Sequence, residues 1–266
     1  MPVYTDQMNR TVEVSATPKR IISIVPSQTE LLFDLGLDAE IIGVTKFCIH
    51  PENKVKQKVK IGGTKALNTN KIKELKPDLI IGNKEENERS QVEELMKNFP
   101  VWMSDIADVN GATEMISRVG ELVGKSAEAE KMVNGIKSGF DQLDIKVSNL
   151  RVAYFIWRKP YIIAGKGTFI DDMLQKCGLT NAFDIARYPG VSAEQLIAAK
   201  PEVILLSSEP YPFKEKHMAE FKTLLPNAII KLVDGELFSW YGSRLLHAPA
   251  YFKQLINEFK SVQSQK

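Results

Sequence analysis

Two stretches of the chain repeat one pattern and decide the fold. Residues 72–83 read Ile-Lys-Glu-Leu-Lys-Pro-Asp-Leu-Ile-Ile-Gly-Asn, and residues 196–207 read Leu-Ile-Ala-Ala-Lys-Pro-Glu-Val-Ile-Leu-Leu-Ser. Each stretch contains the end of a helix, a Lys-Pro stop, an acidic residue and a short buried strand. Upstream of each copy, at residues 31–37 and 173–179, an apolar helix ends at a glycine. The repeat predicts two lobes of similar build, with the working site in the cleft between them.

Composition excludes several classes of protein. The 266 residues, 44% of them apolar, suffice for two α/β units of about 100–150 residues each. With 35 basic and 33 acidic residues, the net charge of +2 gives no field that would attract nucleic acid. No apolar stretch approaches the roughly 20 residues that span a bilayer, and the first residues lack the pattern of a signal peptide. Cys48 and Cys177 fall one in each lobe, which favours two buried thiols over a disulfide.

Residues 1–109 are predicted to form an N-terminal α/β lobe. Buried strands are expected at residues 20–25, 41–44, 79–83 and 101–103, with helices between them. Ser27 and Glu30 have the spacing of a capping box, which predicts Ser27 as the N-cap of the first helix. Strands that alternate with helices indicate a parallel sheet with helices on its faces.

Residues 110–148 carry two helical patterns and no strand pattern. Gly124 is expected to end the first helix and Ser126 to cap a second of about 22 residues, roughly 33 Å long. We interpret the second helix as a rigid connector between the lobes, the alternative being an ordinary helix packed within one domain. Residues 149–266 then form the C-terminal α/β lobe, in which Thr168 and Ser192 are predicted N-caps.

The predicted ligand site follows from the fold class. In sheets of this type, ligands bind beyond the carboxyl ends of the strands. Aromatic faces with a few cationic groups suit a large, flat, partly apolar ligand, although several of these aromatics are expected only to cover strand ends. The candidate ligand-binding residues are Ser27, Phe47, His50, Thr64 and Asn83 in the first lobe, and Trp157, Arg158, Tyr161, Tyr188, Trp240, Tyr241 and Arg244 in the second.

Catalytic and metal-binding motifs are weak or absent. The three histidines have no paired spacing, and no HExxH pattern occurs, so no metal site built by the protein is expected. Residues 165–168 (Gly-Lys-Gly-Thr) lack the spacing of a phosphate-binding loop, and no GxSxG pattern marks a nucleophile. The chain is therefore predicted to be a binding protein without enzymatic activity and without a covalent cofactor.

Several segments resemble a known family. Residues 20–32 (RIISIVPSQTELL), the Lys-Pro-Asp strand, the central helix, residues 190–194 (GVSAE) and residues 241–244 (YGSR) look like the substrate-binding proteins of ABC importers. More narrowly, the chain resembles the helical-backbone receptors for cobalamin, iron-siderophores and haem, from about residue 6 to residue 259. The resemblance implies the class III periplasmic-binding-protein fold, in which two doubly wound parallel-sheet lobes are joined by one long backbone helix. It also implies a monomer in the periplasm or cell envelope.

The resemblance further implies contact with a membrane permease. Family members tend to place one glutamate on each lobe, where it meets permease arginines. Glu194 matches the position in the second lobe, but the first-lobe position holds Asn70. Glu74 and Glu85 are the candidates to substitute for it.

The expected ligand is a metal chelate, with a corrinoid such as cobalamin favoured. Phe47, Trp157 and Tyr188 fall at places comparable to the aromatics of cobalamin binders, although Thr64 and Asn83 stand where those have tryptophans. Trp240 replaces the arginine that siderophore binders often carry. Iron-siderophores and haem stay open as ligands. Two other classes also stay open: an intracellular chaperone or sensor of the same ligands, consistent with the absence of a signal peptide, and a two-domain glycosyl transferase.

Overall fold

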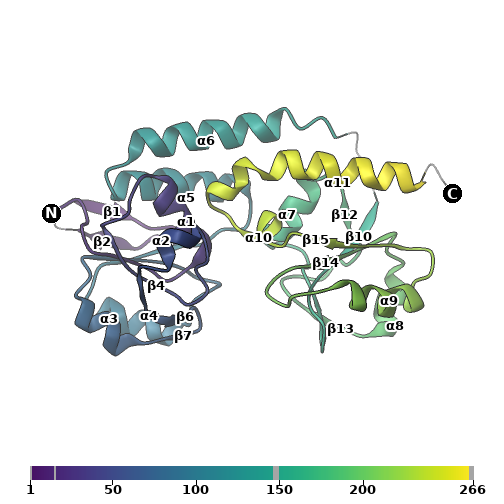
Figure 1. The fold of residues 1–266 in the computed structure, drawn as a ribbon, viewed down its shortest axis with the longest axis horizontal. Helices are drawn as coiled ribbons and strands as arrows, with labels where there is room; N and C mark the ends of the chain where they lie inside the picture. Colours follow the sequence, from purple (N-terminus) through teal and green to yellow (C-terminus); the bar gives the residue numbers. More distant parts are fainter. Residues whose placement is uncertain (1, 15, 146–149, 264–266) are drawn as a thin grey trace. The chain divides into compact units, whose positions relative to one another are not determined.

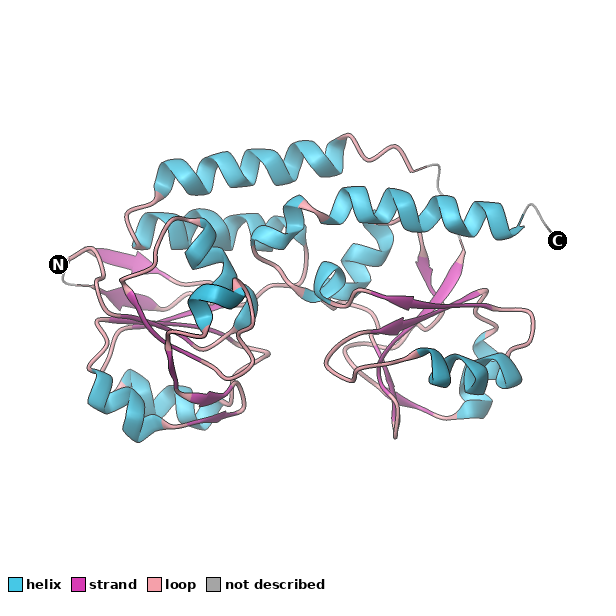
Figure 2. Ribbon diagram, in the orientation of Figure 1, coloured by secondary structure: helices cyan, strands magenta, loops and turns pink. Residues whose placement is uncertain are grey.

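The computed structural model describes residues 2–14, 16–145 and 150–263, drawn in Figures 1 and 2. The chain divides into two compact units. Unit 1 contains Met1–Ile106, Asn110–Gly135 and Tyr241–Ser243, and unit 2 contains Ala107–Val109, Ile136–Trp240 and Arg244–Lys266. This division differs from the predicted ranges 1–109, 110–148 and 149–266, because the central helices are shared between the units and residues 241–243 belong to unit 1.

Unit 1 is built on a parallel sheet. The strand order is β5-β4-β3-β8-β9, and every neighbouring pair is parallel, as the sequence predicted. Figure 1 shows helices α3 and α4 on one side of this sheet and α1 and α5 on the other, which explains why β8 is buried along its whole length. The bounds are β3 Ile21–Ser23, α1 Pro26–Asp34, β4 Ile41–Val44, β5 Val59–Lys60, α3 Thr69–Leu75, β8 Leu79–Asn83, α4 Arg89–Met96, β9 Val101–Ser104 and α5 Val109–Leu122.

Smaller elements complete unit 1. Strands β1 and β2 form an antiparallel ribbon apart from the main sheet, and β6 and β7 form a second antiparallel pair. The bounds are β1 Val3–Thr5, β2 Thr11–Glu13, α2 Glu52–Val55, β6 Gly62–Gly63 and β7 Ala66–Leu67.

Unit 2 contains a mixed sheet. Its order is β13-β11-β10-β14-β15, with β12 also paired to β10. Strands β10, β12, β14 and β15 are parallel, whereas β11 and β13 run antiparallel at one edge, which the sequence did not indicate. The bounds are β10 Arg151–Trp157, β11 Tyr161–Ile163, α7 Phe169–Lys176, β12 Thr180–Asn181, β13 Gly190–Val191, α8 Ala193–Ala199, β14 Val203–Ser207, α9 Glu215–Leu224, β15 Ile229–Val233, α10 Glu236–Ser239, a 3-10 helix Ser243–Leu246 and α11 Ala248–Gln263.

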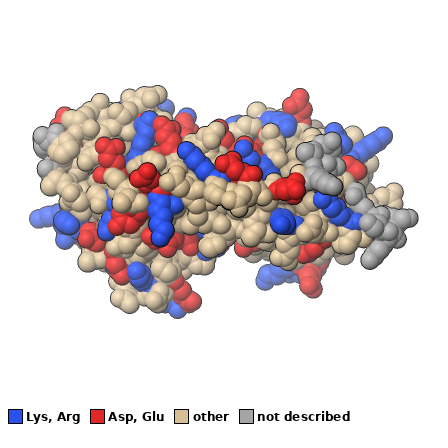
Figure 3. Space-filling model, turned by 90° about the horizontal axis from the view of Figure 1, so that it is seen from above, with Lys and Arg blue, Asp and Glu red and all other residues tan. Residues whose placement is uncertain are grey.

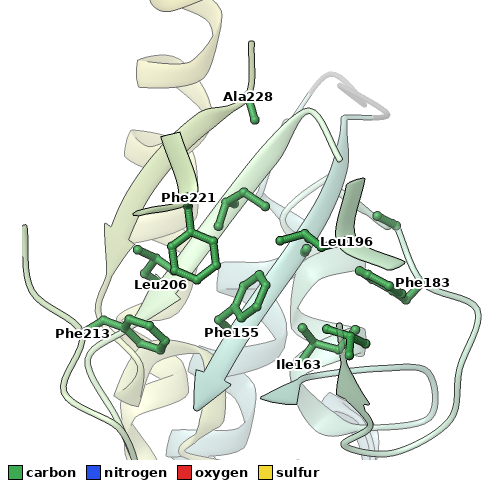
Figure 4. Packing of buried hydrophobic residues seen from close by; sticks show 12 residues of the cluster. Phe155, Ile163, Phe183, Leu196, Leu206, Phe213, Phe221 and Ala228 are labelled. Atoms are coloured by element: carbon green, nitrogen blue, oxygen red, sulfur yellow. The ribbon is translucent and has the colours of Figure 1, made fainter. Parts of the chain in front are cut away.

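An aromatic cluster forms the core on one side of the unit 2 sheet. Figure 4 shows Phe155 of β10 facing Phe221 of α9, and their ring centroids lie 4.7 Å apart. Leu206 of β14 and Phe213 lie beside them, and all four side chains are buried. Interlocked rings of this kind contribute both buried apolar area and favourable ring geometry.

The two copies of the repeated stretch match in their local geometry. Helices α3 and α8 each have seven residues. Asn68 accepts the Lys71 amide at 3.0 Å at the start of α3, and Ser192 accepts the Gln195 amide at 3.2 Å at the start of α8. Both helices end at a lysine in the left-handed region, at positions 76 (φ 45°) and 200 (φ 47°). The following prolines cannot continue either helix.

An arginine and a carboxylate hold each copy to its first strand. Arg20 stands just before β3, and Arg151 is the first residue of β10. Each guanidinium donates to backbone carbonyls at the end of the repeated helix in its own unit. Asp78 accepts the Arg20 amide at 2.9 Å, and Glu202 accepts the Arg151 amide at 3.0 Å. The repeat is therefore a tertiary unit and not only a sequence pattern.

Replacing Asp78 with alanine should lower the free energy of unfolding by about 1–2 kcal/mol, because the amides of Lys19 and Arg20 lose their acceptor. Urea denaturation of the purified chain measures the change. Asp78→Asn is the matched control, because its side-chain oxygen still accepts a hydrogen bond. Equal losses for the alanine and asparagine variants would refute a hydrogen-bonding role.

The prediction that Ser27 caps α1 is wrong. Helix α1 begins at Pro26, its N-cap is Val25, and no side chain caps it. Proline suits the first helical position, so the helix starts one residue before Ser27. The Ser27 hydroxyl is buried and has no hydrogen-bond partner among the described residues. The predicted caps Thr168 and Ser192 are confirmed.

The central helix is shorter than expected. Helix α6 spans Ser126–Asp141, which is 16 residues, or about 24 Å. Ser126 is its first helical residue and not its cap. Residues 142–145 are not helical, and the rest of the expected helix, 146–147, lies outside the described residues. The helix is shared by the two units, which divide between Gly135 and Ile136.

Both cysteines are free and buried, as expected. Burial raises the pKa of the Cys48 thiol, and it raises the pKa of Cys177 to about 12. Because only the thiolate reacts, a water-soluble disulfide reagent at pH 8 should label neither thiol rapidly in the folded chain and both after unfolding. Rapid labelling of the folded chain would contradict this burial.

Candidate functional site

The carboxyl edge of the unit 1 sheet holds a buried polar network. Asn83, at the end of β8, donates to the Ser104 hydroxyl at 3.0 Å, and Gln28 donates to the same oxygen at 2.6 Å. The Asn83 side-chain oxygen accepts the amides of Glu85 and Glu86. Asn83 is only 2% exposed, so this predicted ligand-binding residue uses its amide to fix the strand ends.

Phe47 is the exposed ring of this edge. It follows β4 and is 52% exposed, and the Lys46 ammonium lies 5.1 Å from its ring centroid. A Cβ on Gly63 would lie 3.0 Å from the ring, so the glycine lets Phe47 rest on the β6–β7 pair. Thr64 and His50 are half-buried in the neighbouring loops.

Residues 241–243 pack over the start of α1. The Tyr241 hydroxyl donates to the Glu86 carboxylate. At Gly242, a Cβ would lie 2.7 Å from the carbonyl oxygen of Ser27, so the backbone can approach this closely only because the residue is glycine. Ser243 is buried, and its hydroxyl, like that of Ser27, has no hydrogen-bond partner within the described chain.

Trp157 is the exposed ring of unit 2. It ends β10, is 40% exposed, and lies edge-on to Tyr211 with ring centroids 5.5 Å apart. Its indole N–H donates to the carbonyl of Lys159 at 3.2 Å, which fixes the ring plane. The ring therefore offers a face to a ligand at the carboxyl end of the strand.

Arg158 and Tyr161 are bound to Glu220 of α9. The Arg158 Nε lies 3.0 Å from the carboxylate, and the Tyr161 hydroxyl donates to its other oxygen. Desolvation and the bond to Glu220 raise the pKa of Tyr161 to about 12. Partial burial opposes ionisation of Glu220, but the hydrogen bonds from Tyr161 and Arg158 lower the pKa of its carboxyl below the ordinary value.

Trp240 is held on its edge and on its face. Its indole N–H donates to Glu209 at 2.8 Å, and the Ser239 hydroxyl donates to the same oxygen at 2.6 Å. The Arg244 guanidinium lies 4.9 Å from the Trp240 ring centroid and forms a 2.9 Å ion pair with Glu236. Trp240 is 7% exposed, so its ring is part of the unit 2 core more than of its surface.

Glu209 is a residue that the sequence analysis did not single out. It follows the repeated strand β14, and burial, reinforced by the nearby Glu236 and Asp234 carboxylates, raises its pKa. A Cβ on Gly235 would lie 2.7 Å from its Cγ, so the two segments pack without space for another side chain. The sequence signal that could have pointed to it is an acidic residue two positions after the repeated strand.

The remaining predicted residues lie elsewhere in their units. Tyr188 is half-buried, and the Arg187 guanidinium lies 5.9 Å from its ring. Glu194 is exposed on α8, and a hydrogen bond with Ser192 lowers its pKa. Asn70 is exposed on α3.

Within the described part of the chain, neither surface charge nor grouped metal ligands mark a further site. Among the residues that the structure describes, no three His, Cys, Asp or Glu side chains are grouped to hold a metal ion. Figure 3 shows acidic and basic side chains mixed over the visible face of each unit. None of the described helices combines the length and hydropathy needed to cross a bilayer.

Comparison with known proteins identifies the family. The sequence pattern described as "Periplasmic binding protein" matches residues 21–229. The chain belongs to the periplasmic binding protein family. Its members are transport components and not enzymes, which confirms the prediction of a non-enzymatic protein. The resemblance to substrate-binding proteins of the cobalamin, siderophore and haem group is confirmed as well.

The chain is similar to relatives along most of its length. A vitamin B12-binding protein of Vibrio vulnificus (strain CMCP6) is 26% identical over 266 residues, covering 96% of this chain and 95% of that one. An uncharacterised ABC transporter substrate-binding lipoprotein of Bacillus subtilis (strain 168) is 27% identical over 212 residues, covering 75% and 67%.

Solved structures confirm the class III fold. The periplasmic vitamin B12 binding protein of Vibrio cholerae matches with a TM-score of 0.78 and 21% identity, covering 91% of this chain and 97% of that one. A periplasmic haem-binding protein from Roseiflexus sp. RS-1 matches with a TM-score of 0.79 and 20% identity, covering 90% and 98%. The two scores are nearly equal, so they establish the fold and do not select a ligand.

Proposed function

We propose that this protein captures a corrinoid in the cell envelope and delivers it to an ABC importer. The observation that carries the proposal is an exposed aromatic ring at the carboxyl edge of each sheet, Phe47 in unit 1 and Trp157 in unit 2. Large exposed rings at strand ends favour a flat ligand with an apolar face. The relatives named vitamin B12-binding proteins support the same ligand class.

The pairing of charges favours a corrinoid over an anionic chelate. Arg158 is paired with Glu220, and Arg244 with Glu236, on the edge of unit 2 that carries Trp157. A siderophore or haem carboxylate would have to compete with these carboxylates for the guanidinium groups, at a cost in free energy. The periphery of a corrinoid carries mainly carboxamides, which can bond to polar groups without separating an ion pair.

The ligand contacts proposed for each unit rest on the exposed groups. Phe47 and Trp157 supply stacking surface, and half-buried Tyr188 and His50 supply polar edges. Asn83, Arg158, Tyr161 and Trp240, whose polar groups are bonded within the protein, support the ligand-facing residues. We extend the proposal to docking on a permease, with the exposed, ionised Glu194 of α8 as a contact and Asn70 of α3 as a neutral one.

Equilibrium dialysis against several chelates tests the ligand class. The purified chain is dialysed against cyanocobalamin, cobinamide, haemin and a ferric hydroxamate, and bound ligand is read from its own visible absorbance. We expect saturable binding of one corrinoid per chain, tighter than binding of haemin or the siderophore. If haemin or the ferric hydroxamate binds more tightly than the corrinoids, that chelate and not a corrinoid is the ligand. If none of the four binds, the proposed function is rejected.

A further inference from the structure

Two consecutive aromatics are each bonded to a carboxylate that follows a repeated strand. Trp240 belongs to unit 2, and its N–H donates to Glu209, which comes after β14. Tyr241 belongs to unit 1, and its hydroxyl donates to Glu86, which comes after β8. Strands β8 and β14 are the two copies of the repeat. In each unit, a glutamate shortly after the repeated strand therefore anchors one end of the Trp240–Tyr241 dipeptide, two positions after β14 for Glu209 and three positions after β8 for Glu86.

Each anchor is reinforced by its surroundings. In unit 2, the Glu209 oxygen that accepts the indole N–H also accepts the Ser239 hydroxyl, and the Arg244 guanidinium covers the Trp240 ring. In unit 1, Gly242 lies against the carbonyl of Ser27 with no space for a Cβ. The segment 240–244 is consequently fixed by side-chain bonds at its start and by close packing in its middle.

We infer that Glu209 and Glu86 are positioning residues for ligand binding, which hold the segment 240–244 in its ligand-binding conformation. The inference rests on the proposed function, in which Trp240 supports the ligand-facing residues and Arg244 lies on the edge of unit 2 that carries Trp157. A segment ordered before binding loses less conformational entropy when the ligand arrives. Removing either acceptor leaves Trp240 or Tyr241 with an unpaired donor and releases one end of the segment.

Alanine and glutamine substitutions separate the loss of the acceptor oxygen from the loss of charge. A glutamine side chain still accepts a hydrogen bond from an indole N–H or a hydroxyl, whereas alanine cannot. Dialysis against cyanocobalamin should give affinities about tenfold or more weaker for Glu209→Ala and Glu86→Ala, the scale of one lost hydrogen bond to a charged group. Glu209→Gln and Glu86→Gln should stay within about threefold of the unmodified chain by the same argument. Glu215→Ala and Glu88→Ala, which remove exposed glutamates of α9 and of the α4 N-cap, should bind as the unmodified chain does.

Tryptophan fluorescence reports whether Trp240 is held in place before any ligand is added. In a chain carrying Trp102→Phe and Trp157→Phe, Trp240 is the remaining tryptophan of the three. Its emission should shift to longer wavelength with Glu209→Ala and stay unchanged with Glu209→Gln. A merely structural role would lower the unfolding midpoint and leave the affinity of the folded chain unchanged.

The outcomes separate the two proposals. If the unmodified chain binds a corrinoid and both alanine variants bind it equally well, the positioning role is rejected and the proposed function stands. If the glutamine variants bind as weakly as the alanine variants, the acceptor argument is wrong and the positioning role fails. If the unmodified chain binds no chelate, the proposed function is rejected and the positioning role with it.

Discussion

Replacing Phe155 with alanine should lower the free energy of unfolding of unit 2 by about 3–5 kcal/mol. The ring is fully buried at the centre of the cluster in Figure 4 and contacts Phe221 and Tyr161 at centroid distances of 4.7 and 5.6 Å. Its loss removes buried apolar area and leaves a cavity between β10 and α9. Neighbouring rings anchored on separate elements cannot collapse fully into that space.

Urea denaturation followed by far-ultraviolet circular dichroism measures this loss. Ile197→Ala is the matched control, because Ile197 is an apolar side chain of the same unit that is 46% exposed. The control should change the free energy of unfolding by no more than about 0.5 kcal/mol. A loss below about 1 kcal/mol for Phe155→Ala would contradict the tightly packed core.

Replacing Trp157 with alanine should weaken corrinoid binding by more than about tenfold, because truncating an aromatic anchor commonly costs 2 kcal/mol or more. The ring is exposed, fixed by its N–H bond to Lys159 and supported at its edge by Tyr211. It is therefore already oriented before a ligand binds.

Trp157→Phe keeps an aromatic face and should lose less affinity than Trp157→Ala. Ile197→Ala serves as control here too, since Ile197 lies on α8 and not at the carboxyl end of a strand. The unfolding midpoint of each variant shows whether affinity changes independently of stability. Unchanged affinity in Trp157→Ala would remove this ring from the ligand site.

Local patterns predicted the elements well where the signal was complete within a few residues. The Lys-Pro stops correctly ended α3 and α8, and Thr168 and Ser192 cap their helices as expected. Ser27 failed as a cap because Pro26 can itself occupy the first helical position. Helix α6 was predicted too long because apolar residues such as Leu143 continue the helical spacing after the helix ends at Asp141. Periodicity identifies a face, and it does not mark a boundary.

Exposure within the candidate site could not be read from the sequence. Trp157 and Trp240 were both predicted to bind the ligand, yet Trp157, at the end of β10, is exposed and Trp240, at the end of α10, is buried. The difference comes from partners distant in sequence, since the acceptor of Trp240 is 31 residues away and that of Tyr241 is 155 residues away. The same distances explain why neither Glu209 nor Glu86 was predicted to support the site.

Isothermal titration of cyanocobalamin into the purified chain tests corrinoid capture most directly. We expect one saturable site per chain, with an affinity that falls by more than about tenfold in Trp157→Ala and is unchanged in Ile197→Ala. A flat titration, together with saturable binding of haemin or a ferric siderophore under the same conditions, would contradict the proposed ligand.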